Sequence, residues 1–367
     1  MKRTQSRELD YQKFEDRICL TVVVGVHHGS MVVHGHADGP VEVVGVGDRS
    51  FSVSDNGVDL GTFEHVHHNL RVELDRNAPA DAHDDSLSIE LRDQVIHNVM
   101  VKLGHGDNDF QISGDHVIDR VTYRSASGND SVSVDVNTRF LADASMGGGD
   151  NSMDLNAFSN LVRYRGGHGA DNLNVNETAK ARVLTSIMGH GANEVTVNAD
   201  VHDHLHVRGG FDSDVVTVGE GVHTHGSVSL MLGHGDNVVN YDGFVGDFFR
   251  VRGGAGSDTV NLGASSFAGH HAGIILGAGD NTYNINGGGN GFFLRGTSGN
   301  DDVNLGETVE VNRNVVAVLG DGDNTFNHDG MIHHDLVVVS KNADDLFSAD
   351  GTVEGRTHLD PGGQRGG

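Results

Sequence analysis

The feature that most constrains the fold of this chain is a glycine-rich turn that returns about every 21 residues. Residues 166–174 read GGHGADNLN, residues 253–261 read GGAGSDTVN, and residues 232–240 read LGHGDNVVN. Each copy places an Asn or Asp at the end of the turn and continues with alternating apolar and polar residues. A repeat of this length indicates a solenoid, because one unit alone is too small to bury its apolar side chains.

The residue that closes each turn, here called the anchor, alternates between Asn and Asp along the chain. The anchors are Asn108, Asp130, Asn151, Asp171, Asn193, Asp214, Asn237, Asp258, Asn281, Asp301, Asn324 and Asp345. Their mean spacing, (345−108)/11, is roughly 21.5 residues, within the range of solenoid repeats. The second residue after every anchor is apolar, and the fourth is apolar until His328 and Ala349. This period of two is that of a β-strand.

The pattern predicts an all-β fold, a right-handed parallel β-helix with about 21–22 residues per coil. At about 3.3 Å per residue, one repeat is long enough for three short strands and their corners. The right hand follows from the general handedness of parallel crossovers. We expect the Asn and Asp anchors to stack inside the solenoid as a hydrogen-bonded ladder, since Asn can donate to the carboxylates above and below it. Asp85, which is followed by the same pattern, predicts one earlier rung.

The sequence predicts one repeat domain with irregular ends. Residues 1–17 are expected to form a polar leader or cap, and residues 18–84 an irregular β cap with a flexible loop at 77–84. Regular coils are expected over residues 85–350, and a disordered Gly-rich tail over residues 351–367. The single cysteine, Cys19, excludes an internal disulfide.

Two sets of charged residues follow the alternation of the anchors. Coils with an Asp anchor carry Arg six residues before it, at Arg124, Arg165, Arg208, Arg252 and Arg295. Coils with an Asn anchor carry Asp directly before it, at Asp107, Asp150, Asp236, Asp280 and Asp323. We expect an outward row of alternating charge, which is either a solvated edge or a partner surface.

The formal net charge of −27 argues against a nucleic-acid partner, because phosphate contacts need clustered Lys and Arg. The chain also lacks an apolar run of 18 residues, so no transmembrane helix is expected.

Parts of the chain resemble two groups of known proteins. The segments at 166–174 and 253–261 are similar to the nonapeptide of calcium-binding repeats-in-toxin proteins, although here the nonapeptides stand singly, about one to a coil. Residues 14–20, FEDRICL, resemble a short signature of exported planctomycete proteins, which also contain arrays of Leu-Gly-x-Gly-Asp-Asn turns like those at 103–108, 232–237, 276–281 and 319–324. This resemblance implies export and a cell-surface or extracellular location, although no ordinary signal peptide is visible.

Calcium is the first candidate ligand, because it prefers carboxylate and carbonyl oxygens. The candidate residues are Asp171 and Asp258 in the complete nonapeptides, followed by Asp130, Asp214 and Asp301. The alternative is that these residues, with Asn108, Asn151, Asn193, Asn237, Asn281, Asn324 and Asp345, form a ladder without metal.

Histidine provides a second set of candidates. His168 and His190 have the same offset from consecutive anchors and are expected about one strand spacing apart. His202, His204 and His206 are expected to project from one face of a strand. Imidazole pairs suit Zn, Ni or Cu. The alternative for each cluster is an exposed polar surface without a bound metal.

The sequence favours a non-catalytic function. Acidic residues recur evenly at turns and do not gather at one interrupted site, whereas glycoside hydrolysis needs a pair of carboxylates. We therefore expect a structural or adhesive surface protein that associates with itself or with a cell-surface polysaccharide, with calcium as a candidate stabilising ligand. The alternative is a carbohydrate-binding or polysaccharide-cleaving β-helix.

Overall fold

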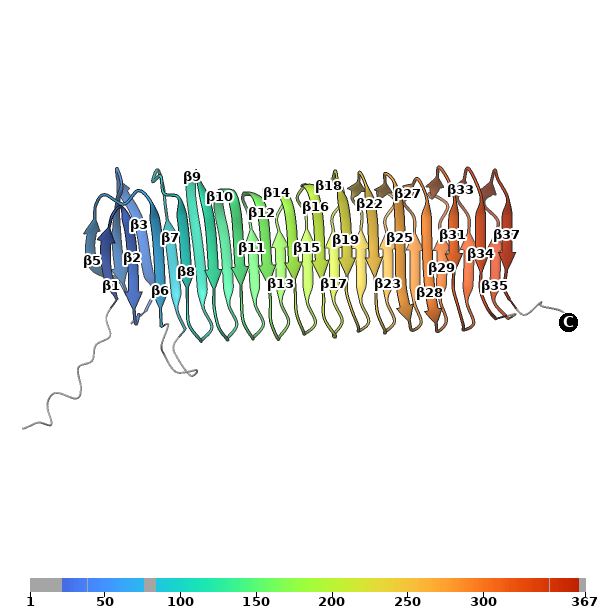
Figure 1. The fold of residues 1–367 in the computed structure, drawn as a ribbon, viewed down its shortest axis with the longest axis horizontal. Coiled ribbons are helices and arrows are strands. Elements are labelled where there is room, and N and C mark those ends of the chain that lie inside the picture. Colours follow the sequence, from blue (N-terminus) through green and yellow to red (C-terminus); the bar gives the residue numbers. More distant parts are fainter. Residues whose placement is uncertain (1–21, 38, 76–83, 343, 363–367) are drawn as a thin grey trace, which may run out of the picture.

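The computed structural model describes residues 22–37, 39–75, 84–342 and 344–362, and these residues form an elongated rod of stacked coils (Figure 1). They contain 37 strands and no helix. Successive coils are joined by parallel strand pairs throughout the repeat region, so the predicted all-β parallel β-helix is confirmed. No helix in the described part of the chain is long and apolar enough to cross a membrane.

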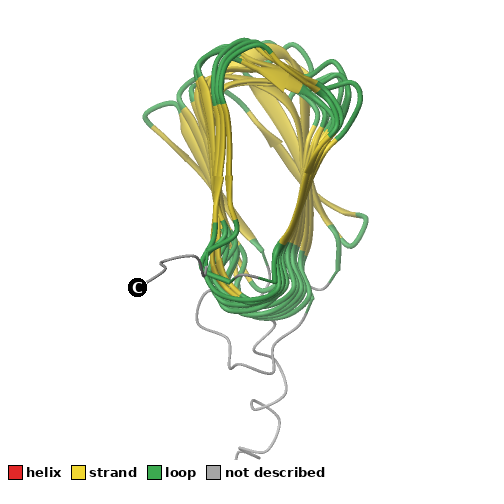
Figure 2. Ribbon diagram, turned by 90° about the vertical axis from the view of Figure 1, so that its right-hand side faces the viewer, coloured by secondary structure: helices red, strands yellow, loops and turns green. Residues whose placement is uncertain are grey.

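Seen along its axis, the rod is a closed coil whose strands form faces around an interior (Figure 2). We call the strands that follow the anchors face 1. In the repeat region they are β7 (Ser86–Glu90), the start of β9 (Asp109–Arg124), the start of β10 (Ser131–Ser145), β11 (Ser152–Leu155), β13 (Asn172–Val175), β15 (Glu194–Val197), β17 (Val215–Val218), β20 (Val238–Tyr241), β23 (Thr259–Leu262), β26 (Thr282–Ile285), β29 (Asp302–Leu305), β32 (Thr325–His328) and β35 (Leu346–Ala349).

Face 2 is the narrowest, with strands of two residues in the later coils. These strands are β18 (His223–Thr224), β21 (Phe244–Val245), β24 (Phe267–Ala268), β27 (Gly288–Gly289), β30 (Glu310–Val311), β33 (Met331–Ile332) and β36 (Thr352–Val353).

Face 3 lies before the glycine-rich turns. Its strands are β2 (Ser30–Gly35), β6 (Asn69–Leu74), β8 (Asn98–Lys102), the ends of β9 and β10, β12 (Phe158–Arg165), β14 (Lys180–Ile187), β16 (Val201–Arg208), β19 (Ser227–Met231), β22 (Phe248–Arg252), β25 (His271–Ala278), β28 (Phe292–Ser298), β31 (Val315–Val318), β34 (Leu336–Val339) and β37 (Thr357–Asp360).

The core is a set of columns in which equivalent residues of successive coils lie above one another. On face 1, Leu173, Val195 and Val216 are partners in the parallel register, and each is at most 1% exposed. Alternate residues on the same strands point outward. This alternation is why the apolar residues two and four places after the anchors predict the core.

The N-terminal region departs from the repeat, as predicted. β1 (Val23–His27) pairs with β2 antiparallel, and β3 (Val41–Gly47), β4 (Ser50–Asp55) and β5 (Val58–Phe63) form an antiparallel meander. β3 then joins β7 in parallel, which links the meander to the first coil. The predicted leader 1–17, Cys19 and most of the predicted loop 77–84 lie outside the described residues.

The solenoid continues beyond the predicted end at residue 350. Strands β36 and β37 pair in parallel with β33 and β34, so the last coil reaches Asp360. Val353 and Leu359 pack against the core from this coil, which gives the segment enough apolar side chains to continue the fold. The prediction of a disordered tail from 351 is therefore wrong for residues 351–360. Residues 363–367 lie outside the described part.

Candidate functional site

The anchors form a buried hydrogen-bonded ladder, as predicted. The backbone N–H of each anchor donates to side-chain Oδ1 of the anchor in the next coil; for example, Asp171 donates to Asn193 over 2.9 Å and Asn193 to Asp214 over 3.2 Å. The same bond joins every rung from Asp85 to Asp345. The ladder therefore gives a buried backbone donor a partner at each corner.

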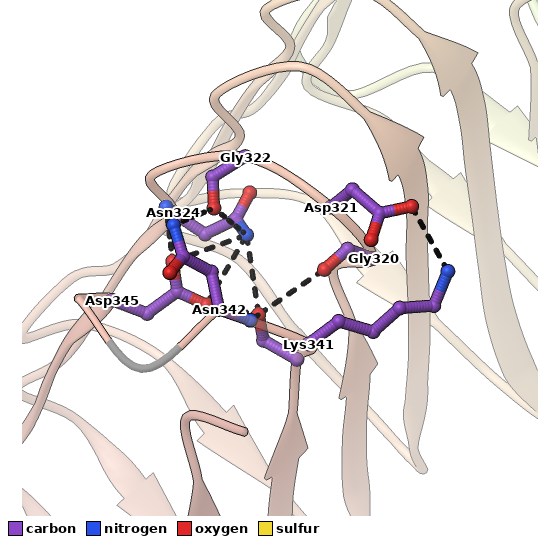
Figure 3. A network of polar contacts seen from close by, with 8 residues as sticks. Gly320, Asp321, Gly322, Asn324, Lys341, Asn342 and Asp345 are labelled. Carbon is purple, nitrogen blue, oxygen red and sulfur yellow. Dashed lines mark hydrogen bonds and ion pairs between the residues drawn. The ribbon is translucent and has the colours of Figure 1, made fainter. Parts of the chain in front are cut away.

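The alternation of Asn and Asp has a direct hydrogen-bonding reason. Nδ2 of Asn193 donates to Oδ1 of Asp214 over 2.7 Å and to the carbonyl of Gly191 over 2.7 Å. The other five Asn rungs repeat both contacts. At the last rung, Asn324 donates to both carboxylate oxygens of Asp345, and Asn342 joins Asn324 on the carbonyl of Gly322 (Figure 3).

From Asp130 onward, the residue five places before each Asp rung is small, and where it is glycine the second carboxylate oxygen fills the space that a Cβ would occupy. A Cβ on Gly253 would lie 1.9 Å from Oδ2 of Asp258, and one on Gly166 would lie 1.9 Å from Oδ2 of Asp171. The equivalent residues in the Asp coils are Ser125, Gly166, Gly209, Gly253, Gly296 and Ser340, whereas the Asn coils carry buried Leu103, Met146, Met188, Leu232, Leu276 and Leu319. This sequence signal separates the two coil types.

Burial raises the pKa of the ladder carboxyls, because a charged group is poorly solvated inside the protein. The pKa values of Asp258 and Asp301 are raised to about 6, although hydrogen bonds from the neighbouring Asn oppose the shift. The pKa values of Asp130, Asp171 and Asp214 are raised for the same reason.

The first rung of the ladder, Asp85, has a second buried carboxyl beside it. Asp85 and Asp75 are both buried, and each has at least one carboxylate oxygen without a hydrogen-bond partner among the described residues. Burial, followed by the charge of Asp75, raises the pKa of Asp85 to about 7. Nδ1 of His36 lies 2.6 Å from Oδ1 of Asp75. No Asn separates the two carboxyls, so this end is the least favourable place for a charge on the ladder.

An outer row of Asp residues makes a second ladder that runs in the opposite direction. Oδ1 of Asp107 accepts the backbone N–H of Asn129 in the next coil over 2.7 Å, and Oδ1 of Asp150 accepts that of Ala170 over 2.7 Å. Asp236 and Asp280 do the same. This row lies in the turns, whereas the arginines six places before the anchors lie on the strands of face 3, four of them at the last residue of the strand. The charges therefore form two separate rows and not the single row predicted.

The five Asp residues predicted as calcium ligands all lie in the inner ladder. Oδ1 of Asp171 accepts both donors of Asn151, and its Oδ2 accepts the N–H of Gly167 over 3.0 Å. Oδ2 of Asp130, Asp258 and Asp301 has no partner in the described part of the chain. Within that part, no group of three or more His, Cys, Asp or Glu is arranged to hold a metal ion. Calcium at these residues stays a prediction, which thermal unfolding in EDTA and in calcium would test.

The structure brings His168 and His190 together, as expected from their offset. Their rings stack 5.0 Å apart at 8°, and the stack continues through Phe211 to His234. Two nitrogens that share a Zn ion at about 2.0–2.1 Å each lie less than about 4.2 Å apart. Both rings would have to tilt out of this stack to bind one metal ion, and a transition-metal site here stays a prediction.

The other predicted histidine group is divided by a corner. Val201 pairs on face 2 with Thr224, whereas His204 begins the pairing of face 3 with Ser227. His202, before the bend, stacks on His225 at 5.0 Å and contacts Asp203. His204 and His206 share face 3. The prediction that all three project from one face is therefore wrong, because the strand bends between 201 and 204.

Face 3 carries a surface that sequence reasoning missed. In eight consecutive coils its five-residue segments contain six Arg and neither Asp nor Glu; the segments are 161–165, 183–187, 204–208, 227–231, 248–252, 271–275, 291–295 and 314–318. We call them the acid-free strip. The chain has 52 acidic residues, so the strip is an exception on the rod.

A groove of about 490 Å³ opens at the N-terminal end of the same face. The outward side chains of Asn69, Arg71, Asn98 and Arg120 line it, together with those of neighbouring residues on β2, β6, β8 and β9. Arg71 is already paired with Glu73, and no carboxylate lines the groove.

Comparison with known proteins returns no match: neither a protein-family model, nor a curated protein, nor a solved structure matches this chain.

Proposed function

We propose that the protein is a non-catalytic structural or adhesive rod of the cell surface or extracellular matrix. The observation that supports this most is the uniformity of the coils. Successive ladder residues from Asp85 to Asp345 are separated by only 20 to 23 residues, so no coil carries a long insertion that could build a catalytic cleft. The groove on face 3 lacks the pair of carboxylates that glycoside hydrolysis needs.

Self-association through the C-terminal edge is part of this proposal. Within the described residues, β35, β36 and β37 each pair only with a strand of the preceding coil. Leu346 at this edge is 72% exposed, and Phe347, Val353 and Leu359 pack only partly buried against the core. Unpaired strand edges with apolar neighbours favour the addition of another strand, and a second rod provides one.

Light scattering over a concentration series tests this assembly. We expect the mass of the wild type to rise with concentration, and the Leu359→Lys variant to stay smaller because it places a charge at the edge of the core. His358→Lys, on the outward side of the same strand, is the matched control and should behave like the wild type. Monomer mass at all concentrations would contradict self-association. Antibody labelling of intact source cells tests the surface location separately.

A further inference from the structure

The arginines of face 3 form a regular row. In the parallel register, Ser145, Arg165, Ile187, Arg208, Met231, Arg252, Ile275, Arg295 and Val318 lie in one outward column. An Arg therefore occurs in every second coil, and uncharged residues occupy the coils between. Two strand spacings place successive guanidinium groups about 9.5 Å apart along the rod.

Most of these arginines are available to a partner. Among the six Arg of the acid-free strip, Arg165 has an ion pair within the described residues, with Asp143 over 3.1 Å. Arg208, Arg252 and Arg295 are exposed and belong to none of the ion pairs found there. Arg250 lies over the ring of Phe248 at 5.1 Å. The strip thus has a formal charge of six positive and no negative groups, on a chain whose net charge is −27.

The strip also presents apolar surface between the charges. Ile187 is 39% exposed, Phe248 37% and Phe293 40%, all on face 3. Binding surfaces for small and extended ligands combine such apolar and aromatic contacts with a few positioned polar groups. Guanidinium groups recognise carboxylates through two parallel hydrogen bonds, which a lysine cannot make.

We infer that face 3 is a binding surface for a linear acidic polysaccharide, laid along the rod axis with its carboxylates on the arginine row. The apolar faces of the sugar rings contact the side chains between the arginines. A linear polymer whose carboxylates recur about every 9.5 Å would place one carboxylate on each arginine of the row. This inference rests on the proposed function, because it requires the rod to lie at the cell surface or in the extracellular matrix, and it adds the chemical class of the partner.

The spacing favours a polysaccharide over nucleic acid. Each strand of duplex DNA carries a phosphate about every 3.4 Å, so its charges are nearly three times as dense as the arginines of the row. Most of those phosphates would face no cation on the strip, and the remaining surface of the rod is acidic. A sparsely charged polymer avoids this repulsion.

The test is isothermal titration calorimetry of the full chain with hyaluronan, which has one carboxylate on every second sugar, at about 50 mM and about 300 mM NaCl. Neutral dextran and single-stranded oligothymidine are the comparison ligands. The test variant replaces Arg208, Arg252 and Arg295 with Gln. The matched control replaces three exposed cations outside face 3, Arg49, Arg92 and Lys341, with Gln.

We expect hyaluronan to bind the wild type and the control equally, to bind the test variant about tenfold or more weakly, and to lose affinity at the higher salt concentration. Absence of hyaluronan binding at low salt, or equal binding by the test variant, overturns the proposal. Tighter binding of oligothymidine than of hyaluronan overturns it in favour of nucleic acid. The proposal is also overturned if no polysaccharide binds and the wild type and the control form salt-sensitive oligomers that the test variant does not form. That result would show that a second copy of the chain covers the strip. Light scattering on the same samples shows whether rod assembly persists, so the two proposals can fail independently.

Discussion

Asn193 donates both its backbone N–H and its Nδ2 to Oδ1 of Asp214, over 3.2 Å and 2.7 Å. One carboxylate oxygen of Asp214 thus accepts two hydrogen bonds from the preceding coil. An ionised Asp has no side-chain donor, so an Asp in place of Asn193 could not make the second of these bonds. The two hydrogen bonds from Asn193 thus favour the ionised form of Asp214 and oppose the rise of its pKa by burial.

The Asn193→Asp variant should therefore be strongly destabilised. It loses the Nδ2 contacts with Asp214 and Gly191 and places a second buried carboxylate beside Asp214. We expect the free energy of unfolding to fall by about 3 kcal/mol or more at pH 8, since hydrogen bonds to charged groups are worth about 1.5–3 kcal/mol. Urea denaturation measures the change. Asn261→Asp, in the part-buried Asn column of face 1, is the control and should lose much less; equal losses would contradict the special role of the ladder.

The pH dependence of stability follows from the raised pKa values of the ladder. The pKa values of Asp258 and Asp301 are about 6 in the folded protein, above the value of about 3.9 in an unfolded chain. Between these values the folded state binds more protons than the unfolded state, so the free energy of unfolding falls as pH rises through this window. We expect each rung to contribute on the order of 1–3 kcal/mol to the loss.

Urea denaturation at pH 5 and pH 7.5 tests this dependence. The contribution of the ladder to the free energy of unfolding of the wild type should be larger at pH 5 than at pH 7.5. Asp258→Asn removes one titrating group and should flatten the profile. If Asp258→Asn does not alter the pH profile, the pKa of this carboxyl is the same in the folded and the unfolded state.

The close approach of Gly253 to Asp258 predicts a steric effect. A Cβ at Gly253 would lie 1.9 Å from Oδ2 of Asp258 and 2.8 Å from the carbonyl of Leu276, and neither atom belongs to a flexible surface side chain. Gly253→Ala should therefore lower the free energy of unfolding by about 3 kcal/mol, as overpacked core substitutions do. Gly273→Ala is the matched control, because no atom lies within 4 Å of its Cβ position. Thermal unfolding of both variants would decide the point, and equal stability would show that the turn moves to make room.

The sequence predicted the ladder because its period, its residue identities and the apolar columns all agree from Asn108 to Asp345. It did not reveal Asp75 as a neighbour of Asp85, because Asp75 is level with Gly104 in the register of face 3 and so stands outside the anchor series. The arginines six places before the anchors were visible as a series. The strand register aligns these arginines with uncharged residues of the intervening coils on one face. The two-residue period of a strand does not by itself fix the register between coils that are 20 to 23 residues apart in the sequence.

The two buried carboxyls at the start of the ladder predict a stabilising substitution. Asp75→Asn would give Asp85 the neighbouring side-chain donor that it lacks, while the Asn oxygen remains available to His36. We expect a gain of about 1–2 kcal/mol at pH 8, and a smaller gain at pH 5, where Asp85 is protonated because its pKa is about 7. Chemical denaturation at both pH values measures it, with Asp59→Asn on β5 as the control. A gain that is the same at both pH values would argue against a charge effect.

His328 in the interior predicts the opposite response to acid. Its ring is fully buried in a column with Leu305 and Ala349, and neither ring nitrogen has a hydrogen-bond partner among the described residues. Burial lowers its pKa, so the unfolded state binds the proton more readily and stability falls as pH drops below about 6.5. His328→Leu removes the unsatisfied ring and matches Leu305, so it should raise the free energy of unfolding by about 1–3 kcal/mol at pH 7 and by more at pH 5.

Hydrogen exchange of the β32 amides, together with urea denaturation, resolves this effect from that of the ladder, because the change should centre on the last coils. His358→Leu, at an exposed position of β37, is the matched control and should alter neither measurement by more than about 0.5 kcal/mol. A His328→Leu variant that is less stable than the wild type would mean that the imidazole makes a favourable contact in the core. A gain independent of pH would mean that only its polarity, and not its charge, opposes folding.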